Sequence, residues 1–277
     1  MTIHPEPMPP FVRTLPLALV LHACMLLTAC SARTPENSAD VVTSDLLEPS
    51  IDALRFSEDT LLLFDSTRQR TIPVALYKDT INARGLILFS HGYGANEPGT
   101  YLRYAYLAKA LAADGQIVVS IQHELPEDPL LAMTGKLQET RRPNWERGAA
   151  NIAFVHAEIL RMHPEWSALP LSLVGHSNGG DMSLLFAEQY PALLRDVITL
   201  DNLRMPFPRA ATPRISSLRA SDTQADPGVL PTAGEQAEFG IEVIQLQATT
   251  HVDMDQRGTE MQQAEIIRRV VELLSRP

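Results

Sequence analysis

The segment Gly175-His176-Ser177-Asn178-Gly179 has the residue types and spacing best suited to covalent chemistry in this sequence. An apolar run at residues 169–174 leads into it, and a helix-compatible stretch follows at once. A Gly-x-Ser-x-Gly pentapeptide between a strand and a helix is typical of a nucleophile elbow, a turn so tight that small residues must flank the serine. The turn raises the hydroxyl above the sheet edge, and the dipole of the following helix favours an oxyanion there. We therefore interpret Ser177 as a nucleophile.

A serine hydroxyl is a poor nucleophile at neutral pH and needs a base. His251 is the only histidine that follows Ser177 in the sequence. It lies between the last expected strand, residues 241–246, and the last expected helix, which is where the order serine, acid, histidine places the base. We predict that His251 accepts the Ser177 proton.

The acid that would orient this histidine has three candidates. Asp222 is preferred, because it falls at the usual distance past the expected strand at residues 215–218. Asp226 lies in an Asp-Pro turn that also follows this strand, and Asp201 ends the preceding strand. Each of them also suits a turn aspartate that bonds its own backbone. The sequence leaves all three open.

A second glycine-rich turn is expected to complete the site. The run from Phe89 to Ala95 reads Phe-Ser-His-Gly-Tyr-Gly-Ala, at the end of an apolar strand. In a nucleophile-elbow fold this loop supplies one oxyanion N–H, and the residue after the nucleophile supplies the other. We assign these donors to the backbone amides of Tyr93 and Asn178. His91 and His176 flank the site and are interpreted as hydrogen-bonding structural residues rather than bases.

From about Thr60 to the C-terminus the chain resembles an α/β-hydrolase, with the elbow, the His-Gly loop and the final histidine in order. Ser-His-Gly-Tyr-Gly at residues 90–94 is similar to dienelactone-hydrolase-like and platelet-activating-factor-acetylhydrolase-like bacterial proteins. Those proteins typically end the next strand in Glu-His-Arg-Asp, whereas residues 122–124 read Gln-His-Glu. Ser177 also replaces the cysteine nucleophile of dienelactone hydrolases. The resemblance implies a serine hydrolase acting on a carboxylic ester.

The elements expected to position these residues alternate between strands and helices. Apolar runs predict strands at residues 61–64, 71–77, 85–90, 116–121, 169–174, 197–200, 215–218 and 241–246. Helical spacing predicts helices at residues 101–113, 145–162, 178–190 and 258–275. This series predicts an α/β-hydrolase fold, with a mostly parallel central sheet covered by helices on both faces. The proline-containing stretch at 202–213 is too short for a large lid domain.

The N-terminal segment reads as a lipoprotein signal. An apolar run follows Arg13 and closes with Leu-Thr-Ala-Cys30, which resembles the lipobox of bacterial lipoproteins. We expect a signal peptide at 1–29, a lipidated tether at 30–58 and the hydrolase domain at 59–277, with translation starting at Met1 or Met8. Because Ser31 rather than an aspartate follows the cysteine, the resemblance to bacterial lipoproteins implies the outer membrane, on its periplasmic side. The two cysteines of the chain, Cys24 and Cys30, both fall in this segment.

Composition limits the partners. A net charge of −10 disfavours nucleic acid, and any membrane contact is expected through the lipid on Cys30 alone. No cofactor and no metal is expected, because the sequence has no Cys/His ligand spacing and no phosphate loop. The expected partner is a small-molecule ester, and oligomeric state is not indicated. A peptidase or amidase, or a binding lipoprotein that has lost turnover, remains open beside the esterase.

Overall fold

The computed structural model describes residues 56–79 and 83–276. The expected signal peptide, the lipidation site Cys30 and nearly all of the expected tether lie outside these residues. The first strand begins at Phe56, slightly ahead of the domain boundary expected at residue 59. Of the helices in the described part of the chain, none is long and apolar enough to cross a bilayer.

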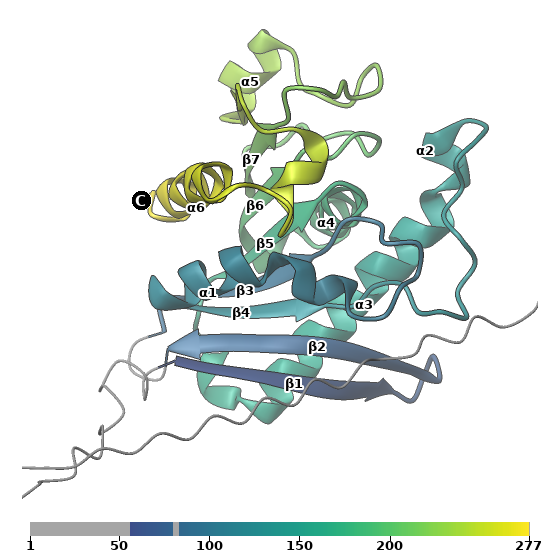
Figure 1. Ribbon diagram of the computed structural model, residues 1–277, viewed down its shortest axis with the longest axis vertical. Helices are drawn as coiled ribbons and strands as arrows, with labels where there is room; N and C mark the ends of the chain where they lie inside the picture. The colour runs from purple at the N-terminus through teal and green to yellow at the C-terminus, as the bar shows by residue number, and fades with distance from the viewer. Residues whose placement is uncertain (1–55, 80–82, 277) are drawn as a thin grey trace, which may run out of the picture. The chain divides into compact units, whose positions relative to one another are not determined.

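An eight-stranded sheet forms the centre of the fold, with strand order β1-β2-β4-β3-β5-β6-β7-β8 (Figure 1). β1 pairs antiparallel with β2, and β2 pairs antiparallel with β4, whereas every other neighbouring pair is parallel. The strands are β1 (Phe56–Asp65), β2 (Arg70–Asp79), β3 (Gly85–Ser90), β4 (Gln116–Ile121), β5 (Leu171–His176), β6 (Leu194–Leu200), β7 (Arg214–Arg219) and β8 (Glu242–Gln245). The mostly parallel sheet predicted from the sequence is confirmed.

The burial of the central strands explains why they could be recognised in the sequence as continuous apolar runs. Every residue of β3, β4 and β5 is buried, as expected for parallel strands covered on both faces. β1 instead alternates: Leu63 is buried, whereas Leu62 and Phe64 on either side are exposed. This alternation is typical of an edge strand with one covered face.

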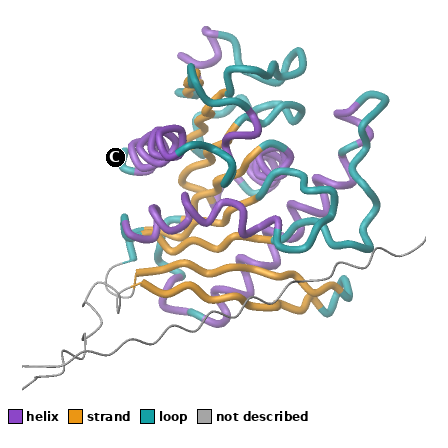
Figure 2. Tube along the Cα trace, in the orientation of Figure 1, coloured by secondary structure: helices purple, strands orange, loops and turns teal. Residues whose placement is uncertain are grey.

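Helices cover both faces of the sheet (Figures 1 and 2). α1 (Ala105–Ala113) and α6 (Glu260–Leu274) pack with one set of strand residues, and α3 (Arg142–Met162) and α4 (Asn178–Gln189) pack with the other. Shorter elements are η2 (Thr100–Tyr104), α2 (Leu137–Thr140), η3 (Pro164–Trp166), η4 (Pro191–Leu193), α5 (Ala233–Phe239) and η5 (His251–Met254). Together the layers are those of the α/β-hydrolase fold.

The segments at the carboxyl ends of the parallel strands carry the residues of interest. Ser177 follows β5, Asp201 follows β6, and His251 begins η5 after β8. The connection at residues 202–213 contains no helix and holds no lid domain. α5 was not predicted, although Thr232 and Glu235 form a capping box at its start.

Candidate active site

Ser177 stands in a strained turn between β5 and α4. Its φ of 51° and ψ of −120° place it in a region that costs a non-glycine residue about 1–3 kcal/mol. The Ser177 N–H donates to the Leu200 carbonyl over 2.9 Å, which ties the turn to β6. A Cβ at Gly175 would lie 2.5 Å from the Gly179 carbonyl oxygen, and a Cβ at Gly179 would clash with the Ser90 carbonyl oxygen. Close backbone approach therefore requires glycine at both positions.

Ser177, His251 and Asp201 form one chain of hydrogen bonds. His251 Nε2 lies 2.9 Å from Ser177 Oγ, and His251 Nδ1 lies 2.5 Å from Asp201 Oδ2. A carboxylate can only accept, so the imidazole carries its proton on Nδ1 and presents Nε2 to the serine as an acceptor. This is the arrangement by which a base withdraws a hydroxyl proton during nucleophilic attack.

Donors surround the Asp201 carboxylate on all sides. Oδ1 accepts from the Ala220 N–H at 3.0 Å and faces Arg219 Nη2 at 2.7 Å, while Oδ2 accepts from the Thr223 hydroxyl as well as from His251. Burial alone would raise the pKa of Asp201. Hydrogen bonds from His251, Thr223 and Ala220, together with the positive charge of Arg219, outweigh burial and hold this pKa below its ordinary value. The carboxylate is therefore kept charged and fixed in orientation.

The other two candidate aspartates are placed elsewhere, which corrects the preference for Asp222. Asp222 Oδ1 accepts from the backbone N–H of His251 at 2.7 Å and so contacts the main chain rather than the ring. Asp226 forms an ion pair with Arg204 at 2.5 Å. The physical reason lies in the sheet: β6 pairs directly with β5, so Asp201 emerges beside Ser177.

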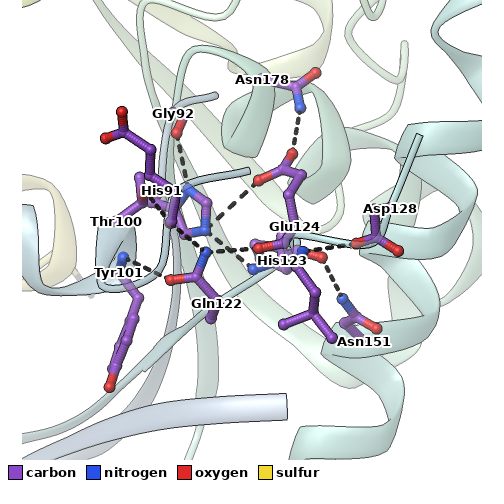
Figure 3. A network of polar contacts seen from close by, with 12 residues as sticks. His91, Gly92, Thr100, Tyr101, Gln122, His123, Glu124, Asp128, Asn151 and Asn178 are labelled. Atoms are coloured by element: carbon purple, nitrogen blue, oxygen red, sulfur yellow. Dashed lines mark hydrogen bonds and ion pairs between the residues drawn. The ribbon is translucent and has the colours of Figure 1, made fainter. Parts of the chain in front are cut away.

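Asn178, the residue after Ser177, is held by a buried polar network. Asn178 Nδ2 donates to Glu124 Oε1 at 3.1 Å and to Asn144 Oδ1 at 2.8 Å, and Asn178 Oδ1 accepts from Trp145 Nε1 at 2.9 Å. Figure 3 shows Glu124 reaching from the end of β4 towards Asn178. Glu124 is 1% exposed, and its Oε2 has no hydrogen-bond partner within the described residues. The network fixes the start of α4.

His91 connects the glycine-rich loop to the same network (Figure 3). Its Nδ1 lies 2.8 Å from the Gly92 carbonyl, and its Nε2 accepts from the His123 backbone N–H at 3.0 Å. Burial lowers the pKa of His91, which keeps the ring neutral. With both ring nitrogens engaged by main-chain groups, His91 joins the loop of Tyr93 to the segment that follows β4.

The expected oxyanion donors are Tyr93, in the glycine-rich loop, and Asn178, which directly follows Ser177. Tyr93 lines the same cavity as Ser177, a space of about 260 Å³. Asn178 is the first residue of α4, and the first N–H groups of a helix have no acceptor within it. Their use as oxyanion donors stays a prediction.

A larger cavity lies away from these residues. It has a volume of about 780 Å³ and is bounded by α3, α4 and the stretch around Phe207, without Ser177 in its lining. The smaller cavity, by contrast, is lined by both Ser177 and His251. Among the described residues, no group of His, Cys, Asp and Glu side chains is placed to hold a metal ion.

Sequence reasoning missed several residues that support the site. Arg219 and Thr223 contact Asp201, and Glu124 and Trp145 contact the network around Asn178. The polar residues that directly follow the buried strand β4 were a signal for Glu124, since charge so close to a fully buried strand requires partners. No comparable signal marks Arg219, which ends a strand in an ordinary way.

The strand order and the placement of Ser177 between β5 and α4 are those of an α/β-hydrolase fold. The fold is similar to that of dienelactone hydrolase from Anabaena variabilis, at 15% identity and a TM-score of 0.50, over 79% of this chain and 96% of that one. It is also similar to a dienelactone-hydrolase-like promiscuous phosphotriesterase from metagenomic libraries, at 16% identity and a TM-score of 0.58, over 80% and 98% of the two chains.

A putative esterase from Staphylococcus aureus has the same fold, at 11% identity and a TM-score of 0.55, over 80% of this chain and 84% of the other. No protein-family model and no curated protein sequence matches the chain. At these identities the solved structures show a shared fold.

Proposed function

We propose that the protein is a serine hydrolase that cleaves a carboxylic ester through an acyl-enzyme intermediate. Ser177 Oγ attacks the acyl carbon while His251 Nε2 takes its proton. Asp201, in place of the Asp222 preferred from the sequence, holds the Nδ1–H tautomer and stabilises the imidazolium. His251 then returns the proton to the departing alcohol, and water hydrolyses the acyl-enzyme by the same steps in reverse.

The backbone amides of Tyr93 and Asn178 are assigned to the oxyanion of the tetrahedral intermediate. One such donor typically contributes about 3 kcal/mol to transition-state stabilisation. Donors fixed beforehand act without reorganisation during the reaction, so the buried bonds of Asn178 to Glu124 and Trp145 support this assignment.

One observation carries the proposal: the chain of contacts from Ser177 Oγ through His251 to Asp201, at 2.9 and 2.5 Å. The backbone strain at Ser177 agrees with a chemical role for this residue, because such strain clusters at active sites. The hydrolases and esterases among the structural neighbours agree with a hydrolase in general.

The test compares the domain from residue 31 onward with its Ser177→Ala variant. Both are treated with a fluorophosphonate probe and then with p-nitrophenyl esters of increasing acyl length. We expect labelling and turnover in the wild type and neither in the variant. A folded wild type that neither reacts with the probe nor hydrolyses the esters would contradict the catalytic proposal. It would favour a binding protein with a hydrolase fold.

The same assay separates esters from amides. The small cavity at Ser177, about 260 Å³, agrees with a short substrate, and we expect the p-nitrophenyl esters to be preferred over matched anilides. A preference for the anilides would mean that the protein is a peptidase or amidase rather than an esterase, because the same triad cleaves both esters and amides.

We also propose that Cys30 carries a lipid that anchors the domain on the periplasmic side of a bacterial outer membrane. The lipobox-like Leu-Thr-Ala-Cys30 supports this. Full-length protein should then fractionate with outer membranes in a Gram-negative host, and Cys30→Ser should abolish lipidation as read by intact mass. Equal distribution of the two forms, with masses that differ only by the exchange of sulfur for oxygen, would contradict an anchor.

A further inference from the structure

A second chain of hydrogen bonds runs through the interior, from the loop of Tyr93 to the loop of His251. The Gly92 N–H donates to the Tyr104 hydroxyl over 3.0 Å. That hydroxyl lies 2.7 Å from His176 Nδ1, and His176 Nε2 lies 3.1 Å from the His251 carbonyl oxygen. The residue just before the nucleophile therefore connects the two loops that flank it.

The partners assign every proton in this chain. A carbonyl only accepts, so His176 carries a proton on Nε2. Burial, reinforced by the neighbouring His251, lowers the pKa of His176 to about 3, so the ring is neutral and Nδ1 bears no proton. Nδ1 then accepts from the Tyr104 hydroxyl, which itself accepts from Gly92. All donors point in one direction, from Gly92 towards His251.

Close packing leaves this chain little freedom. Tyr104 is 2% exposed and His176 is 4% exposed. The ring of His176 lies 5.6 Å from that of Tyr104 and 4.7 Å from that of His251, measured between centroids. A Cβ at position 92 would lie 2.6 Å from His176 Nδ1, so only glycine fits there. The loops can move apart only by breaking buried hydrogen bonds, which is costly.

We propose that Tyr104 and His176 are positioning residues that keep the oxyanion loop and the base loop in fixed relation to each other. This inference rests on the proposed hydrolase function. Both side chains act through main-chain atoms: Gly92 directly precedes the assigned donor Tyr93, and the His251 carbonyl belongs to the residue that carries the base. A shift at either end displaces a group that is used in the transition state.

Tyr104→Phe tests the proposal, because it removes only the hydroxyl. We expect kcat for a short p-nitrophenyl ester to fall on the order of tenfold, with KM changed less than about twofold, since alignment in the transition state is disturbed and ground-state binding is not. Ser120→Ala is the matched control. Its buried hydroxyl donates to the Tyr101 carbonyl over 2.7 Å, outside the chain, so stability should fall and kcat should stay unchanged.

A double-mutant cycle excludes a general loss of stability. His176→Gln can present an amide N–H to the His251 carbonyl but has no acceptor at the position of His176 Nδ1, so adding Tyr104→Phe to it should lower kcat less than about twofold further. Equal costs in the two backgrounds would overturn the coupling. If Tyr104→Phe does not fold, His176→Asn, which keeps the acceptor and loses the donor, carries the same expected fall in kcat.

The outcomes distinguish this inference from the proposed function. Circular dichroism and melting temperature first establish that each protein is folded. Wild-type turnover together with undiminished kcat in Tyr104→Phe would overturn the positioning role alone. A folded wild type without turnover would overturn the hydrolase proposal, and the positioning role with it.

Discussion

Asp201 and Arg219 form an ion pair that is sealed from solvent, with 2.7 Å between Asp201 Oδ1 and Arg219 Nη2 and side chains that are 0% and 5% exposed. The other terminal nitrogen of Arg219 donates to the Asn202 carbonyl over 2.7 Å. Asp201 follows β6 and Arg219 ends β7, so the pair spans two neighbouring strands. A buried carboxylate needs a nearby positive charge to stay ionised. Arg219 supplies that charge to Asp201, the residue that follows β6.

The first prediction separates the two aspartates that flank His251. Asp201→Asn should lower kcat on the order of 10³- to 10⁴-fold, because the amide no longer fixes the productive imidazole tautomer. Asp222→Asn should lower it less than about tenfold, since Asn Oδ1 still accepts from the His251 N–H. Steady-state kinetics on p-nitrophenyl acetate measures both. A larger loss in Asp222→Asn than in Asp201→Asn would reverse the assignment.

The second prediction concerns Arg219. Arg219→Met should lower the free energy of unfolding by about 3–5 kcal/mol, because it leaves the Asp201 carboxylate buried without its countercharge. Arg219→Lys should lower the free energy of unfolding less, because lysine retains the positive charge and lacks only the planar guanidinium group with its paired donors. Urea unfolding at neutral pH measures both variants. Equal losses would mean that shape, rather than charge, determines the stability at this position.

The third prediction concerns Glu124. Glu124→Ala should cost about 2–4 kcal/mol of stability and reduce kcat, because the buried amides of Asn144 and Asn178 lose their acceptor. Glu124→Gln preserves an oxygen for both amides and should change stability by less than about 1 kcal/mol. Thermal melts and kinetics on the two variants provide the comparison. If Glu124→Gln is as damaging as Glu124→Ala, the network depends on the charge.

The fourth prediction is a pH dependence at Asp181. Burial raises the pKa of this carboxyl to about 6, even though it accepts from the backbone N–H groups of Met205 and Arg204. The folded protein therefore binds this proton more tightly than the unfolded chain does. The contribution of Asp181 to stability is most favourable below about pH 4 and falls as the pH rises towards 6.

Asp181→Asn removes this ionisation and retains an oxygen for both N–H groups. Relative to the wild type, the variant should gain roughly 1–3 kcal/mol of stability between pH 4 and pH 7. Urea unfolding of both proteins across this range measures the difference. A difference that stays constant with pH would show that Asp181 does not titrate there.

Much of the fold was predictable from local pattern. β3 and β4 have the bounds expected for them, because continuous apolar runs between polar segments admit few alternatives. α5 was missed because it is short and has no buried residues, so no apolar periodicity marks it. Its local signals were the capping box at its start and Gly240 at its end.

The site was less accessible to sequence reasoning. The expected nucleophile and base follow from chain order and from the uniqueness of one histidine, and the structure brings Ser177 and His251 together. The choice among the aspartates depends on strand adjacency and on where Arg219 lies, and both are properties of the sheet. Local sequence around Asp222 resembles that of an acid-bearing turn, but it carries no information about which carboxylate reaches the ring.

His251 has a carboxylate at its ring and another at its backbone N–H, contributed by different strands of the sheet. Mechanically, the residue is held at two points: Asp201 restrains the imidazole, and Asp222 restrains the main chain that carries it. With both its ring and its backbone held, His251 has little freedom to turn away from Ser177.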